Sequence, residues 1–195
     1  MKRIILASSS PRRIEMMKKN GYEPEIIPAD VDERIHIQMS CEAAAMYLAY
    51  KKASHVAEEI IAAAPVGDHE THDDIIVIAA DTIVVYDNEI IGKPHSRREA
   101  FDVLSRLRSD SHRVMTGVAI IDTERNIKDC FCDISTVYFG SYTDDELLKY
   151  VSTDEPYDKA GGYAIQGTFG KYIDHFEGDY DNVIGFPWYK VKEYL

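Results

Sequence analysis

A single carboxylate interrupts the most apolar stretch of the sequence. Residues 75–86 read Ile-Ile-Val-Ile-Ala-Ala-Asp-Thr-Ile-Val-Val-Tyr, so that Asp81 and the neighbouring Thr82 are set into a run of aliphatic side chains. A run of this kind without polar alternation predicts a central strand that is covered on both faces. Burying a carboxylate is costly unless a cation or a metal ion compensates it. Asp81 therefore needs a partner from elsewhere in the chain, or it lies at a strand bend and caps local backbone.

A second group of chemically capable residues lies near the N-terminus. Residues 4–7 are apolar and predict a short strand, and residues 8–13 read Ser-Ser-Ser-Pro-Arg-Arg before a helical pattern begins. The serine before Pro11 predicts a helix N-cap, because its hydroxyl can accept a backbone N–H and proline has none to leave unsatisfied. The free N–H groups of a helix start, together with Arg12 and Arg13, favour a bound anion. The alternative is an ordinary capped helix whose arginines face solvent.

Two polar segments could hold a metal ion. Asp30, Asp32 and Glu33 form a carboxylate cluster that could bind a divalent cation through oxygen ligands, although a solvated loop is the common alternative in an acidic chain. Residues 65–74 carry histidines and acids, but their turn-rich composition favours an exposed, mobile loop over a metal site.

The elements that must position these residues alternate along the chain. After the first strand and helix, Gly21 predicts a helix end, and a short edge strand is expected within residues 22–28. The further predicted helices are 43–64 with Ser40 as N-cap, 96–107, 144–151 with a capping box from Thr143, and 183–195 with Asn182 as N-cap. The further predicted strands are 90–92, which folds back on the central strand through a hairpin turn at 86–89, and the pair 112–121 and 127–139.

Composition limits the class of protein. The 195 residues form one domain or two intimately joined lobes. Their 22 basic and 34 acidic residues give a net charge of −12, which argues against stable nucleic-acid binding and against anionic membranes. Three cysteines, Cys41, Cys130 and Cys132, have no zinc spacing and indicate a reduced protein, with the latter two as small strand hydrophobes and not nucleophiles. The initial apolar run is too short for a signal peptide, so a cytoplasmic protein without a membrane segment is expected.

Taken together, several motifs resemble the Maf, or septum-formation-inhibitor-like, nucleoside triphosphate pyrophosphatases. They occur in the family's order and span nearly the whole chain. They are residues 7–13 (Ala-Ser-Ser-Ser-Pro-Arg-Arg), 32–33 (Asp-Glu), 52–53 (Lys-Ala), 80–82 (Ala-Asp-Thr), 92–94 (Gly-Lys-Pro), 112–117 (His-Arg-Val-Met-Thr-Gly), 154–167 (Asp-Glu-Pro-Tyr-Asp-Lys-Ala-Gly-Gly-Tyr-Ala-Ile-Gln-Gly) and 182–187 (Asn-Val-Ile-Gly-Phe-Pro).

The resemblance implies a fold, an activity and a cofactor. The expected fold is α/β, a single domain over 1–195 with an elongated mixed β-sheet, flanking helices, and two lobes around a central active-site cleft. The expected activity is hydrolysis of a nucleoside triphosphate between the α and β phosphates, with a divalent cation, Mg²⁺ or Mn²⁺, as cofactor and a homodimer as the working form. Arg12, Thr82 and residues 159–167 are similar to the branch acting on dTTP and UTP, with modified pyrimidine triphosphates as further candidates.

Roles follow for individual residues. A triphosphate brings about four negative charges into an acidic protein, so cationic side chains must converge on it. The expected catalytic residues are Asp81 as proton acceptor, Lys52, Lys93 and Glu33, and the expected metal ligands are Glu33 and Asp81. The expected substrate-binding residues are Ser8, Arg12, Arg13, Thr82, Lys159 and Gln166, with Thr82 and Gln166 reading the base.

Two other readings remain open at this point. One is a pyrophosphatase that acts on 7-methyl-GTP or another non-standard nucleoside triphosphate. The other is a non-catalytic protein that inhibits septum formation, which a test for metal-dependent hydrolysis would separate from an enzyme.

Overall fold

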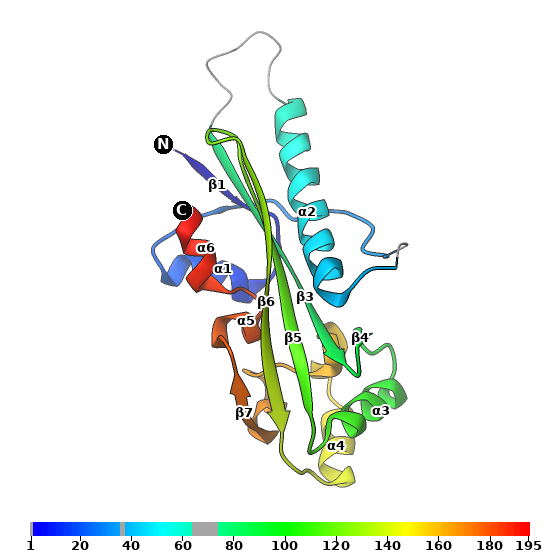
Figure 1. Ribbon diagram of the computed structural model, residues 1–195. Coiled ribbons are helices and arrows are strands. Elements are labelled where there is room, and N and C mark those ends of the chain that lie inside the picture. Colours follow the sequence, from blue (N-terminus) through cyan, green and yellow to red (C-terminus); the bar gives the residue numbers. More distant parts are fainter. Residues whose placement is uncertain (1, 36–37, 64–73) are drawn as a thin grey trace. The chain divides into compact units, whose positions relative to one another are not determined.

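The computed structural model describes residues 2–35, 38–63 and 74–195 (Figure 1). Of the polar segment predicted as an exposed loop, residues 65–73 lie outside the described residues. The strands are β1 (Arg3–Leu6), β2 (Glu25–Ile26), β3 (Ile75–Tyr86), β4 (Glu89–Ile91), β5 (Ser111–Asp122), β6 (Ile127–Phe139) and β7 (Ile173–Glu177). The α-helices are α1 (Pro11–Lys19), α2 (Cys41–Ala63), α3 (Arg97–Leu107), α4 (Asp144–Tyr150), α5 (Tyr180–Ile184) and α6 (Trp188–Val191). Short 3₁₀ helices are η1 (Glu155–Asp158), η2 (Ala160–Gly162), η3 (Thr168–Tyr172) and η4 (Lys192–Tyr194).

The strands form one mixed sheet, as the α/β prediction requires. Its order is β2-β1-β3-β5-β6-β7, and β4 pairs with β3 off this path. β1 is parallel to both β2 and β3, whereas β4 on β3 and β7 on β6 are antiparallel. The chain divides into two compact units. Unit 1 comprises Met1–Asp81, Gly117–Cys132 and Trp188–Leu195, and unit 2 comprises Thr82–Thr116 and Asp133–Pro187.

In unit 1 the long helix α2 packs on one face of the sheet. Its small side chains Ala49 and Ala53 are fully buried in a cluster with Val77 and Ala79 of β3. Figure 1 shows α1 and α6 on the opposite side of these strands from α2, so the apolar β3 is covered on both faces as its composition predicts. Among the described residues no helix combines the length and the apolar character needed to cross a membrane.

Glycine at position 117 permits the close approach of α2 to β5. A Cβ at Gly117 would lie 2.2 Å from the carbonyl carbon of Ala45 and 2.3 Å from its oxygen, so no larger residue fits without moving the helix backbone. Real Cβ atoms do not approach backbone this closely, and the helix position therefore depends on this one missing side chain.

In unit 2 the core is strongly aromatic. Phe169 and Leu147 are fully buried. The centroid of the Phe139 ring lies 5.6 Å from that of Phe169 and 5.3 Å from that of the buried His112. The His112 Nε2 atom shares a hydrogen bond of 2.5 Å with the hydroxyl of Tyr163, while its Nδ1 is buried without a partner. Burial lowers the pKa of His112 to about 4, with Asp110 acting in the opposite direction.

Local signals explain most element boundaries. The β3–β4 hairpin turns at Asp87 and Asn88, whose φ values of 50° and 61° are those of a two-residue turn with left-handed backbone. Ser40 accepts from the N–H of Ala43 at the start of α2, and Thr143 forms the predicted capping box with Glu146 at the start of α4.

Of two expected caps, one is correct in position only and the other is wrong. Ser10 is the N-cap residue of α1 and Pro11 its first residue, as predicted, but the Ser10 side chain accepts no capping hydrogen bond, and the Ser10 N–H donates to Ser8 Oγ. Asn182 does not cap a final helix, because Asp179 performs that role for α5 and Asn182 lies buried inside it.

The single C-terminal helix predicted over residues 183–195 is also wrong. Gly185 takes a left-handed φ of 108° and ends α5, after which Pro187 offers no N–H to continue a helix. The chain restarts as α6 and then η4. The short edge strand predicted within residues 22–28 consists of only the two residues of β2, because Pro24 and Pro28 flank it.

We expect Gly117→Ala to destabilise the protein by about 3 kcal/mol or more, because the added methyl overlaps helix backbone that must shift. Urea unfolding measures the loss. Gly92→Ala is the matched control, since no heavy atom lies within 4 Å of a Cβ there, and it should change the free energy of unfolding by less than about 0.5 kcal/mol. Equal stability of the two variants would contradict the close approach.

The buried His112 should make stability fall in mild acid. The unfolded state takes up a proton near pH 6.5, whereas folded His112 does so only near its pKa of about 4, so unfolding is favoured between these values by up to about 1.4 kcal/mol per pH unit. His112→Gln removes this contribution. Urea unfolding at several pH values from 7.5 to 4.5 should therefore show a shallower decline for the variant, and parallel curves would refute the assignment.

Candidate functional site

The turn between β1 and α1 is held by one guanidinium. Arg13 Nη1 donates to the carbonyl oxygen of Ala80 at 2.8 Å and to Ser8 Oγ at 3.1 Å. The Ser10 N–H also donates to Ser8 Oγ, at 3.3 Å. Arg13 thus links the serine turn to the residue directly before Asp81.

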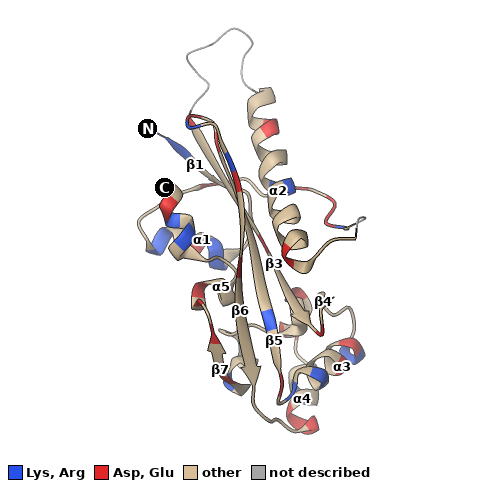
Figure 2. Cartoon of the chain, viewed as in Figure 1, with Lys and Arg blue, Asp and Glu red and all other residues tan. Residues whose placement is uncertain are grey.

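Arg13 lies in a cluster of charges. The pKa of Arg13 is lowered to about 10, mainly because burial disfavours its charged form. The Asp81 and Glu33 carboxylates raise the pKa, whereas the positive charge of Arg12 lowers it further. At neutral pH the guanidinium therefore still carries its proton. Figure 2 shows basic residues gathered on α1, whose first turn contains no acidic residue, so positive charge stands at this helix start where the backbone N–H groups already favour an anion.

Lys52 joins the two predicted carboxylates. Its Nζ lies 2.6 Å from Asp81 Oδ1 and 2.8 Å from Glu33 Oε1. The Lys52 and Asp81 side chains are each 13% exposed, whereas Glu33 is 59% exposed, so the inner pair is shielded and the outer acid meets solvent. We call these three residues the acid–lysine cluster. It supplies the partner that the buried Asp81 requires, and the alternative of a strand-bend cap is unnecessary.

The acid–lysine cluster fits a small divalent cation in its donor chemistry. Two carboxylates converge on one point, which Lys52 Nζ occupies, and hard cations such as Mg²⁺ are held by one or two carboxylates with further oxygens from water and phosphate. Over residues 2–35, 38–63 and 74–195 no group of three or more His, Cys, Asp or Glu side chains is placed to hold a metal ion. Asp32 is turned to Arg34, which it binds through both oxygens. A metal would therefore depend on oxygens that a ligand brings.

Unit 2 contains the other predicted side chains. The Gly161 N–H donates to the Gly92 oxygen at 3.1 Å, which ties the glycine-rich segment to the residue before Lys93. Lys93 is exposed, and Lys159 donates to the Glu155 oxygen at 2.7 Å and to Asp158 Oδ1 at 2.5 Å. Lys159 is therefore already paired with the Asp158 carboxylate before any substrate binds. Gln166 is exposed.

Thr82 belongs to a polar network of unit 2 that reasoning from the sequence missed. Its Oγ1 lies 3.0 Å from Thr116 Oγ1, which in turn donates to the Asn182 oxygen at 3.2 Å. Asn182 Nδ2 donates to Ser135 Oγ at 2.9 Å and to the Val114 oxygen at 3.2 Å. One usable signal was Thr116, a polar residue within the stretch Val114–Ile121 of β5, whose other side chains are apolar or absent.

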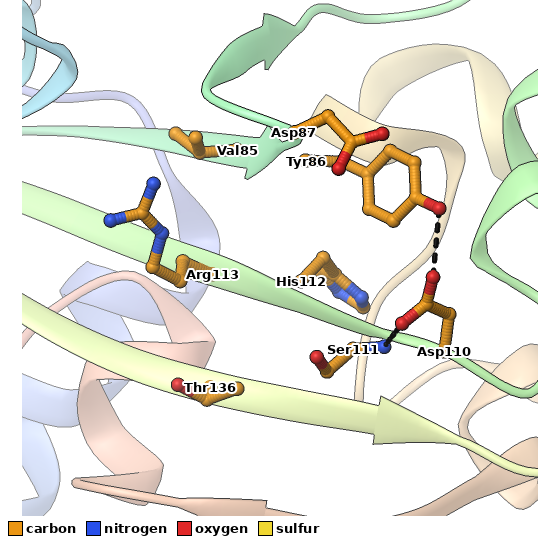
Figure 3. Close-up of a pocket in the computed structure, with 8 residues that line it drawn as sticks. All are labelled: Val85, Tyr86, Asp87, Asp110, Ser111, His112, Arg113 and Thr136. Carbon is orange, nitrogen blue, oxygen red and sulfur yellow. Dashed lines mark hydrogen bonds between the residues drawn. The ribbon is translucent and has the colours of Figure 1, made fainter.

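Unit 2 also contains a pocket (Figure 3). It has a volume of about 310 Å³ and is lined by Val85, Tyr86, Asp87, Asp110, Ser111, His112, Arg113 and Thr136. The Tyr86 hydroxyl donates to Asp110 Oδ2 at 2.8 Å, and Asp110 Oδ1 accepts the Ser111 N–H. Its lining includes none of the residues predicted to bind substrate.

The structure thus brings together part of the predicted site. In unit 1 it gathers Ser8 and Arg13 at the serine turn and Glu33, Lys52 and Asp81 in the acid–lysine cluster. Arg12 lies next to Arg13 and forms no hydrogen bond or ion pair with any described residue. In unit 2 it joins the segments of Lys93 and Lys159, and it places Thr82 in the buried network.

Comparison with known proteins identifies the family of this chain. The family described as Maf-like protein matches residues 3–195. A dTTP/UTP pyrophosphatase of Caldicellulosiruptor bescii is 44% identical over 192 residues, which cover 98% of this chain and 92% of the relative. Proteins with the same name from Alkaliphilus oremlandii and from Geobacillus sp. (strain WCH70) are each 42% identical, over 98% and 96% of this chain and 93% of each relative. Across nearly its whole length, this chain belongs to the Maf family.

Proposed function

We propose that this chain hydrolyses dTTP and UTP to the corresponding monophosphate and pyrophosphate. The observation that carries the proposal is the acid–lysine cluster, in which a shielded Asp81 carboxylate is held on Lys52 beside a helix start rich in positive charge. The family supports the substrate, since the relatives described above bear the name dTTP/UTP pyrophosphatase. A homodimer in the cytoplasm is the form that we infer from family resemblance.

We expect the triphosphate to meet the positive charge of unit 1. Arg12 and Arg13 lie in the first turn of α1, and Lys52 is on α2. Lys93, which follows β4 in unit 2, keeps its predicted catalytic role as a further cation. These cations offset the charge that grows on the leaving group, which is where electrostatic stabilisation contributes most to phosphoryl chemistry. Ser8 and the backbone N–H groups that follow it offer hydrogen bonds to phosphate oxygens.

Asp81 has the role of proton acceptor. A water oxygen attacks the α-phosphorus, the bond from that phosphorus to the α–β bridging oxygen breaks, pyrophosphate leaves with the bonding electron pair, and the water proton passes to Asp81. The ion pair with Lys52 fixes the carboxylate direction before the substrate arrives. Glu33 and Asp81 would hold Mg²⁺ or Mn²⁺, which supplies Lewis-acid charge neutralisation when bound.

We expect pyrophosphate release from dTTP and UTP in the presence of Mg²⁺, and at least about 100-fold less with excess EDTA, because the cluster alone lacks the charge to replace the cation. A coupled assay for pyrophosphate over a panel of nucleotides measures both. GTP, 7-methyl-GTP and ATP serve as comparison substrates. Preferential hydrolysis of 7-methyl-GTP would overturn the substrate assignment, and absence of any metal-dependent release would overturn the enzyme.

Asp81→Asn should lower kcat for UTP at least about 100-fold, since the amide keeps the shape of the carboxylate but accepts no proton from water. Circular dichroism and urea unfolding should show an intact fold. The matched control is Asp102→Asn, on an exposed acid of α3 whose carboxylate pairs with Arg98, and it should retain wild-type kcat. Near-normal turnover by Asp81→Asn would exclude Asp81 as proton acceptor.

A further inference from the structure

The carboxylate of Glu155 is bound at both of its oxygens. Oε1 accepts the backbone N–H of Thr168 at 2.9 Å, and Oε2 accepts the Thr168 hydroxyl at 2.6 Å. The hydroxyl of Tyr150 also lies 3.5 Å from Oε1. Hydrogen bonds to an ionised acceptor are about twice as strong as those between neutral groups. Glu155 therefore holds Thr168 through its backbone and its side chain at once.

These two hydrogen bonds close a loop in unit 2. Glu155 and Thr168 lie 13 positions apart, and the segment between them contains three glycines. It also carries two of the predicted substrate-binding residues, Lys159 and Gln166. Glycines give a segment much conformational freedom, which a fixed contact between its two ends restricts. The positions of both side chains therefore depend on the contact that closes the loop.

Glu155 acts on both of these side chains. The Lys159 Nζ atom donates to the carbonyl oxygen of Glu155 at 2.7 Å, so the main chain of Glu155 orients the lysine. Gln166 is two residues before Thr168, which the Glu155 carboxylate binds. The carbonyl of one residue thus orients the lysine at the start of the loop, and its carboxylate fixes the backbone that follows the glutamine.

Gly167 leaves the space that the carboxylate needs. A Cβ at this position would lie 2.0 Å from Glu155 Oε1 and 3.2 Å from the carbonyl oxygen of Ala164. Any side chain there would push the carboxylate away from Thr168. The residue directly after Gln166 is thus matched to the same contact.

We propose that Glu155 is a positioning residue for the hydrolysis of the nucleotide, because its carboxylate closes the loop that presents Lys159 and Gln166 to the substrate. The inference rests on the proposed function, in which these two residues contact the nucleotide. The useful property of Glu155 is the reach of its two acceptors and not its negative charge, which would repel a triphosphate. A neutral amide of the same length should therefore replace it, whereas a shorter acid should not.

The first experiment compares kcat/KM for UTP in wild type, Glu155→Gln, Glu155→Asp and Glu155→Ala. The glutamine oxygen can accept the Thr168 N–H, and its amide can donate to the Thr168 hydroxyl oxygen. Aspartate keeps the charge but is one methylene too short. We expect Glu155→Gln to stay within about threefold of wild type, and the other two to fall at least about tenfold, mainly through a higher KM. An active Glu155→Asp beside an impaired Glu155→Gln would show a role of charge and overturn the inference.

A second experiment separates positioning from a merely structural role. The change Glu155→Ala is introduced into wild type and into a background that carries Lys159→Ala and Gln166→Ala. If Glu155 acts through these two side chains, its loss should lower kcat/KM at least about tenfold in wild type but less than about threefold in the background without them. The same factor in both would overturn the inference.

Urea unfolding checks that each variant is folded. Should Glu155→Ala or Glu155→Asp fail to fold, Glu155→Gln alone decides, since retained kcat/KM supports the inference and a tenfold loss overturns it. In that case the proposed function still stands if the wild-type protein releases pyrophosphate from UTP. Wild-type protein without this activity would instead overturn the proposed function.

Discussion

The ion pair between Asp81 and Lys52 is the interaction on which the candidate site depends. A carboxylate in the middle of an apolar strand is tolerated only if a cation stays within contact distance, and Lys52 does so at 2.6 Å. Both residues are on regular elements, β3 and α2, so neither side chain relies on a loop for its position. Loss of the lysine would remove the direct ion pair of this shielded carboxylate and leave Arg13 as a nearby cation. The same contact therefore affects both stability and chemistry.

The backbone of unit 1 is built to permit this contact. Alanines at the α2 face and the bare backbone of Gly117 bring the helix close to the sheet, and a lysine stem is long enough to extend along that interface to β3. The cation then reaches two acids of very different exposure. Glu33 is open to solvent, so a ligand can contact this outer acid directly. Asp81 is shielded, so a ligand does not easily displace this inner acid from Lys52.

The sequence predicted the fold best where local rules and burial agree. The bounds of β3 follow from its long, mainly apolar run, the hairpin from Asp87 and Asn88, and α4 from its capping box. Prediction failed near the C-terminus, where Asn182 is a residue type that commonly caps helices. In the structure the Asn182 side chain forms buried hydrogen bonds inside α5, and Gly185 ends that helix with left-handed backbone. For the site, the resemblance named Lys52 and Glu33, and the apolar run named Asp81. The hydrogen-bond partners of Thr116 could not be predicted, because they lie 34 and 66 positions away in the chain and no local pattern reveals such pairs.

Asp81 and Thr82 are consecutive residues of one strand, and successive side chains of a strand point to opposite faces. The acid is therefore on the α2 face and the hydroxyl on the other, joined by a single peptide bond. Insertion or deletion of one residue upstream in β3 would exchange the two faces and abolish both contacts at once. Length variation among descendants of this chain must accordingly be absorbed before Ile75 or after Tyr86, and never within the strand.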